Sequence, residues 1–146
     1  MRDSQKSKVY KAETVFSVRE DLSFVSIYEC QIYADKVRAS ACWARYATRH
    51  PLYVEIVHWR GYSGLASYSG RTIKLGRRSM YRLLLLHELA HCGAPQGVRH
   101  GWQYCNLYLK LVCHFMGRAA WLKLRAAFKT NRVKVHPPRQ QKRIEV

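Results

Sequence analysis

The chain has 146 residues and a formal net charge of +17, because 26 Lys and Arg stand against 9 Asp and Glu. This length predicts a single domain, and a hydrophobic fraction of 48% is enough for one core, which argues against a wholly disordered chain. No run of 18 apolar residues is present and the N-terminus lacks the apolar segment of a secretion signal, so we expect no membrane span and no membrane partner.

The five cysteines are an odd number and form no CxxC pair, which argues against a disulfide framework and favours a reducing cytoplasm. The positive charge is concentrated after residue 56, where the only acids are Glu88 and Glu145. A charge of this size favours a polyanionic partner. We therefore expect non-specific binding of DNA or RNA at low salt, through the basic surface and the C-terminal tail.

The first half of the chain predicts one long helix and then short strands. Residues 1–8 are polar and are expected to be frayed, and residues 9–17 fit neither a helix nor a strand clearly. Apolar residues recur near helical spacing over 26–46, which predicts an amphipathic helix. Residues 52–59 are rich in β-branched and aromatic side chains and predict a strand.

Two further strands and three helices follow. Short segments at 65–68 and 72–75, separated by glycine-containing turns, predict strands that form an antiparallel meander with the first. A helix over 80–91 is predicted from its apolar run, with Ser79 as N-cap and Gly93 as C-cap. Helices are also predicted from residue 101 or 102 to 116 and over 119–129, because Gly117 interrupts the pattern between them.

These elements together predict an α+β fold in a single domain over residues 9–130. A small antiparallel or mixed sheet of about three strands packs on the helix at 80–91, and two to three further helices complete the domain. Residues 131–146 contain two prolines and many basic side chains, which predict a flexible basic tail.

The predicted helix at 80–91 carries the sequence HELAH, in which His87 and His91 are four residues apart. Residues at this spacing project from one helix face, so two imidazoles can bind one metal ion with Zn–N bonds of about 2.0–2.1 Å. Glu88 lies beside the first histidine and can act as the general base that takes a proton from zinc-bound water. Glu88 is also the only acid between Glu55 and Glu145, and its presence in so basic a stretch supports a specific role.

A catalytic zinc site commonly has three protein ligands and one open position, so a third ligand is needed. His100 is the preferred candidate, because the loop before it contains glycines and a proline that let the chain turn back towards the metal. His114 is a weaker candidate, since it lies in the middle of a predicted helix. Cys92 adjoins His91 but points to a different helix face.

The sequence HELAH, followed by a loop and then HGWQY, resembles the minimal zincin metallopeptidases of the SprT/Spartan type. In those proteins the HExxH motif precedes a His-Gly pair with an aromatic residue four positions after that histidine. More closely, the chain is similar to a family of small metallohydrolases found in actinobacteria and their phages. The matching pieces are VYKAE at 9–13 with Val15 and Phe16, QIYADKV at 31–37, LHELAH at 86–91, His100-Gly101, GRAAW at 117–121 and AAF at 126–128.

This resemblance implies zinc on His87, His91 and His100, with Glu88 as base, in an α+β fold whose sheet edge lies beside the metal-binding helix. In zincins that edge often holds an extended protein or peptide substrate. Tyr68, which precedes the helix, would then supply a hydrogen bond to the transition state. The high positive charge and the tail depart from the family, and the family does not fix a substrate. A phage-encoded protein would act in the bacterial host cytoplasm.

We therefore predict a zinc-dependent hydrolase, and specifically a metallopeptidase that acts on proteins associated with nucleic acid. Two alternatives stay open. The protein can instead bind nucleic acid or a host partner with a structural or vestigial zinc site, although no cysteine lies where a compact zinc knuckle needs one. It can also be a metal-dependent nuclease, as YbeY-type endoribonucleases are, but those use another histidine spacing and lack the glutamate of HExxH.

Overall fold

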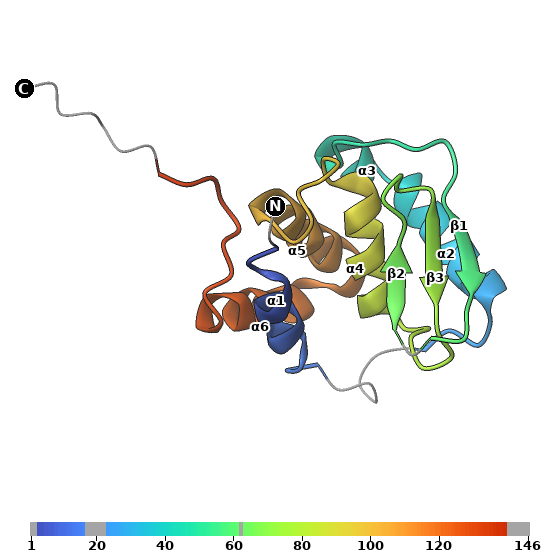
Figure 1. Cartoon of the computed structure of the whole chain (residues 1–146), viewed down its shortest axis with the longest axis horizontal. Coiled ribbons are helices and arrows are strands. Elements are labelled where there is room, and N and C mark those ends of the chain that lie inside the picture. The colour runs from blue at the N-terminus through green and yellow to red at the C-terminus, as the bar shows by residue number, and fades with distance from the viewer. Residues whose placement is uncertain (1–2, 17–22, 62, 140–146) are drawn as a thin grey trace, which may run out of the picture.

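The computed structural model describes residues 3–16, 23–61 and 63–139, and within these ranges it is an α+β arrangement of six helices and one three-stranded sheet (Figure 1). The predicted fold class is therefore confirmed. In chain order the elements are α1 (Lys6–Glu13), α2 (Ile27–Arg38), α3 (Ala41–Tyr46), β1 (Glu55–His58), β2 (Gly64–Ala66), β3 (Thr72–Leu75), α4 (Arg82–Gly93), α5 (Trp102–Met116) and α6 (Arg118–Thr130).

The sheet is mixed, with the strand order β1-β3-β2. β1 runs parallel to β3, with Ile56 opposite Ile73, whereas β2 is antiparallel to β3, with Leu65 opposite Lys74. The mixed alternative is thus confirmed and the antiparallel meander is wrong. The turn signals predicted where strands end, but they carry no information about which strands become neighbours, and here β3 lies between the two strands that precede it.

The outer edge of β1 is occupied by a side chain of α2. The amide of Gln31 donates to the carbonyl of Val54 at 2.8 Å, and its oxygen accepts from the backbone N–H of Ile56 at 2.8 Å. A side-chain amide thereby takes the place of a neighbouring strand, which protects an edge that would otherwise invite pairing. β2, at the other edge of the sheet, lies beside α4 (Figure 1).

Two helix predictions need correction in the first half of the chain. The helix predicted over 26–46 is divided into α2 and α3, because the Ser40 hydroxyl accepts from the Trp43 N–H at 3.1 Å and so caps a new helix. The segment expected to be frayed contains the start of α1, whose Val9 and Ala12 are fully buried and which packs on α6. Local polarity hid this helix, since its burial depends on α6, more than a hundred residues later.

The helices of the second half follow the prediction with small shifts at their ends. α4 begins after Tyr81 rather than Ser79, and Gly93 is its last helical residue. Figure 1 shows α4 between β2 on one side and α5 on the other, and both contacts bury it. Leu85, Leu86 and Leu89 on α4 have no exposed surface. None of the described helices is both long enough and apolar enough to cross a membrane.

Candidate metal centre

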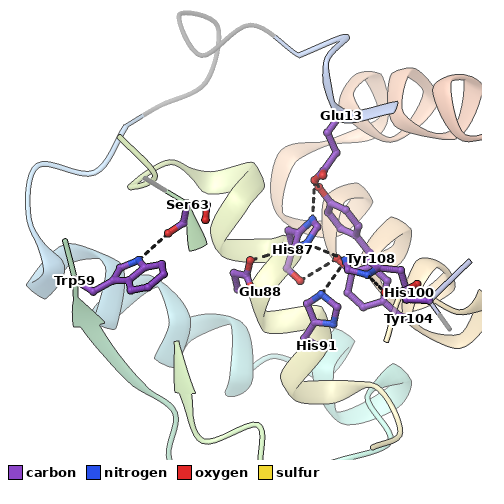
Figure 2. Close-up of polar contacts among 10 residues, drawn as sticks. Glu13, Trp59, Ser63, His87, Glu88, His91, His100, Tyr104 and Tyr108 are labelled. Carbon is purple, nitrogen blue, oxygen red and sulfur yellow. Dashed lines mark hydrogen bonds and ion pairs between the residues drawn. The ribbon is translucent and has the colours of Figure 1, made fainter. Parts of the chain in front are cut away.

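Three histidines meet where α4 faces the loop that leads into α5. His87 and His91 lie one turn apart on α4, and His100 stands just before Gly101, the N-cap of α5 (Figure 2). Their ring nitrogens all lie within 4.8 Å of one another, and His87 and His100 are buried. The cluster is closed by the sharp loop between the helices, in which Gly97 adopts a φ of 85°.

The two distances from His100 to the other histidines fit ligands of a single tetrahedral ion. Nε2 of His100 lies 3.2 Å from Nε2 of His91 and 3.4 Å from Nε2 of His87. Two ligands with bonds of about 2.0–2.1 Å at a tetrahedral angle have their nitrogens about 3.3–3.4 Å apart. His100 is therefore at tetrahedral spacing from both other histidines, and this buried cluster can hold a metal ion.

Two carboxylates from the N-terminal segment orient two of these rings. Oε2 of Glu13 lies 2.8 Å from Nδ1 of His87, and Oδ2 of Asp3 lies 2.7 Å from Nδ1 of His100. In the tautomer that donates from Nδ1 to a carboxylate, Nε2 keeps its lone pair for the metal. Carboxylate–histidine pairs of this kind fix the tautomer and the ring orientation in metal sites and make the ligand more basic.

Tyrosines enclose the histidines. The ring of Tyr104 stacks on His91 with 4.1 Å between centroids, and its hydroxyl donates to the carbonyl of His87 at 3.0 Å. Tyr108 donates to the same Glu13 oxygen that binds His87, at 2.6 Å. Tyr10 of α1 lies parallel to the ring of His87, 5.6 Å away. His87 and His100 are thus held by packing as well as by hydrogen bonds, and the His91 ring is held by its stacking on Tyr104.

Burial favours the neutral, metal-binding form of two of the histidines. Burial lowers the pKa of His91 to about 2, and the neighbouring His87 and His100 act in the same direction. Burial also lowers the pKa of His100, although Asp3 partly opposes this. For His87 burial again lowers the pKa, but the charge and hydrogen bond of Glu13 outweigh it, so that the pKa is raised overall.

Glu88 is buried beside the cluster and points towards it (Figure 2). Its Oε1 lies 3.9 Å from Nε2 of His87, beyond hydrogen-bond distance, and a backbone hydrogen bond links it to Ala66 of β2. Burial raises the pKa of Glu88, while His87 and the Ala66 hydrogen bond lower it in part. A general base works best when its pKa lies near the working pH, and the raised pKa of Glu88 is a shift in that direction. A metal cation nearby would lower the pKa again.

β2 approaches Glu88 so closely that any side chain at position 64 would press against it. A Cβ atom there would lie 3.0 Å from both Cγ and Oε1 of Glu88. Gly64 therefore lets the edge strand lie against the carboxylate. The sequence analysis treated this glycine only as part of a turn. The signal was present, because a glycine inside a strand often marks a close approach.

A cleft of about 400 Å³ opens in front of His91, His100 and Glu88. β2 and the turn after it form one wall, and the loop before α5 forms another. Arg49 joins these walls, since its guanidinium donates to the carbonyl of Ala94 at 2.7 Å and to that of Tyr68 at 3.2 Å. Tyr68 lines the cleft from the turn and is 75% exposed, and its predicted catalytic hydrogen bond stays a prediction.

The structure sorts the remaining ligand candidates by position. His114 is exposed and its ring lies against Phe115, outside the cluster, and Cys92 is fully buried but belongs to no group of candidate ligands in the described residues. All five cysteines are free thiols.

The sequence analysis assigned no role to Asp3 and quoted Glu13 only within the family resemblance, because neither lies near the motif in the chain.

Comparison of the chain with models of protein families, with curated proteins and with solved structures found no match. The assignment of this centre therefore depends on its own geometry and on the motif that forms it.

Proposed function

We propose that the protein is a zinc-dependent hydrolase, and specifically a metallopeptidase. One observation carries the proposal: three histidines whose ring nitrogens lie within 4.8 Å of one another adjoin a cleft that is lined by His91, His100 and the buried carboxylate of Glu88. Three imidazole ligands with one open position are typical of catalytic rather than structural zinc. The likeness of HELAH and HGWQY to SprT-type zincins supports the same conclusion.

In this proposal the chain's own residues bind the metal and move the proton. A zinc ion supplies a Lewis acid that makes water nucleophilic near neutral pH and polarises the carbonyl under attack. Glu88 accepts the proton of the attacking water and passes it to the leaving amine. Its Oε1, 3.9 Å from Nε2 of His87, would then lie within reach of water bound to the metal.

The peptide substrate would lie along β2. This strand pairs with β3 on one side, no other described strand pairs with it, and Gly64, Leu65 and Ala66 all line the cleft. An extended peptide can add to such an edge through main-chain hydrogen bonds, which would hold its carbonyl in front of Glu88.

The test is the substitution Glu88→Gln in the zinc-loaded full chain. Hydrolysis of an unfolded protein or a quenched peptide library should fall by about 10²–10⁴-fold, the contribution of a general base. Zinc content and the melting temperature should stay close to wild type. Glu55→Gln, at an exposed glutamate on β1, is the matched control and should leave activity unchanged.

Peptidase activity that is unchanged in Glu88→Gln would contradict the role of the base. If the zinc-loaded wild-type protein cleaved RNA but no peptide, the peptidase proposal would be wrong and the nuclease alternative would be favoured.

A further inference from the structure

A second groove lies on the far side of α1 from the metal cleft. It has a volume of about 320 Å³ and lies between α1 and the end of α6. All of its lining residues are polar or charged: Ser7, Lys8, Lys11, Thr130, Asn131 and Arg132. Three of them are cations and none is an acid, and in the described part of the chain no ion pair involves Lys8, Lys11 or Arg132.

The cation at position 132 occupies a backbone site that usually carries glycine. Arg132 has a φ of 57°, in the left-handed region. The N–H of Val133 binds the carbonyl of Phe128 at 2.9 Å, and that of Arg132 binds the carbonyl of Lys129 at 3.2 Å, which together make a Schellman ending for α6. An arginine in this backbone conformation has a higher conformational free energy than a glycine would have. Strained residues of this kind cluster at functional sites.

The wall that contains Arg132 is fixed to the N-terminal segment. The Lys134 N–H donates to Oε1 of Gln5 at 2.6 Å, and Nε2 of Gln5 lies 3.1 Å from the Lys134 carbonyl. Gln5 is 93% buried by these contacts, since only 7% of it is exposed, and Val133 is buried as well. The two walls of the groove are therefore joined by hydrogen bonds, and the segment after α6 is held in place.

The surroundings of the groove are also strongly positive. α6 contributes Arg118, Lys123, Arg125 and Lys129 and contains no acid. The only acids of the neighbouring N-terminal segment are Asp3 and Glu13, and both are bound to histidines of the metal centre. Both carboxylates are thus held at the metal centre, and no ion pair among the described residues involves the three cations that line the groove.

We propose that the groove between α1 and α6 binds the phosphodiester backbone of nucleic acid without sequence specificity. Lys8 and Lys11 stand about one helical turn apart on one face of α1, and Arg132 faces them across the groove, so that consecutive phosphates meet a cation on either wall. Ser7, Thr130 and Asn131 add neutral hydrogen-bond donors, which also commonly contact phosphate oxygens. The absence of any apolar side chain among these lining residues favours a nucleic acid over a lipid surface.

The test is the salt dependence of binding between the zinc-loaded full chain and a short fluorescent DNA of mixed sequence. The triple variant Lys8→Ala, Lys11→Ala, Arg132→Gly should bind at least about tenfold more weakly at about 50 mM salt, and its slope of log K against log[salt] should be smaller by about 2–3. The matched control removes three exposed cations on the sheet side, Lys36→Ala, Arg60→Ala and Lys74→Ala, and should change the slope much less.

The variants are chosen so that unfolding does not imitate loss of binding. Alanine favours the helix at positions 8 and 11, and glycine suits the backbone at 132, so the melting temperature and the zinc content of the triple variant should not fall. An equal loss of affinity in both triple variants would overturn the proposal, because it would reduce the effect to net charge. Tighter binding of polyglutamate, or of phosphatidylserine vesicles, than of DNA with the same charge would overturn the assignment to nucleic acid. None of these readouts requires hydrolysis, so this proposal and the proposed activity can fail separately.

Discussion

The two sides of α1 face very different environments. Residues 6, 10 and 13 form one stripe that lines the metal cleft or touches its histidines, and residues 7, 8 and 11 form another that lines the basic groove. Between them Val9 and Ala12 hold the helix to the core. On the metal side the Glu13 carboxylate has two partners, whereas on the groove side Lys8, Lys11 and Arg132 form no ion pair with any residue that the structure describes.

This difference teaches how one short helix can serve two kinds of recognition. The metal side is preorganised, since the histidine nitrogens already lie close together before an ion binds. Loss of a contact that supports them should lower the affinity for the metal. The groove side acts through charge and needs no fixed side-chain geometry, which suits a backbone that carries phosphates at every step. Substitutions on the two sides should therefore change different measurements, and four predictions test that separation.

The largest effect is expected from the carboxylates that support the histidines. Asp3→Asn and Glu13→Gln should each weaken zinc binding by about 10–100-fold, and Glu13→Gln more strongly, because Glu13 also holds Tyr108. Competition with a chromogenic chelator measures this. Asp35→Asn, at an exposed acid of α2, is the control, and equal losses in all three variants would show that the supporting contacts are unimportant.

The next effect is on the stability of the metal-free protein at low pH. The pKa of His91 falls from 6.5 to about 2 in the folded state, and that of His100 is also lowered, so below pH 6.5 the unfolded chain binds more protons at these sites. The free energy of unfolding should therefore decrease as the pH falls from 6.5. A single buried histidine corresponds to at most about 3 kcal/mol by pH 4.5, and the raised pKa of His87 offsets part of this. The free energy of unfolding in urea, measured at about pH 6.5 and about pH 4.5, tests this. Equal values at the two pH values would contradict the account.

A smaller effect is expected at the edge strand. Gly64→Ala places a Cβ atom 3.0 Å from Oε1 of Glu88 and should displace that carboxylate. Peptide hydrolysis should fall by roughly tenfold, about 1.4 kcal/mol in the barrier, and further in Gly64→Val. Zinc content should not change, since the histidines are untouched. If Gly64→Ala lost zinc and activity together, β2 would be supporting the metal site rather than positioning the base.

The smallest effect belongs to Arg132→Gly alone. Removal of the side chain from a left-handed position should raise the free energy of unfolding by less than about 1 kcal/mol, because the gain is partly offset by the freedom of glycine in the unfolded chain. DNA affinity should nevertheless decrease. Chemical denaturation and DNA titration of this one variant separate the two roles, and a destabilised protein would mean that the arginine stabilises the fold instead.

The sequence could predict those parts of the site that depend on residues close to one another in the chain. His87 and His91 are one helical turn apart in a helix recognisable from its apolar run, and the glycine-containing loop brought His100 within reach. Asp3 and Glu13 could not be found in this way. They lie 97 and 74 residues from the histidines that they bind, and their positions depend on how α1 packs against α6.

The same distinction holds for the fold. Thr72–Leu75 was predicted as a strand with its observed bounds, because strand composition and turn residues are local. Its place between β1 and β2 was not, since parallel pairing of β1 with β3 involves residues that are distant in the sequence. The division between α2 and α3 was within reach, as Ser40 is a typical N-cap residue, but an uninterrupted apolar pattern outweighed it.

The most direct test of the metal centre is the zinc content of the untagged full chain, purified without chelator and measured by mass spectrometry. The account predicts about one zinc per chain in the wild type and in His114→Ala, and a large loss in His100→Ala. A folded wild-type protein that retains no zinc and takes up none when zinc is added would contradict it.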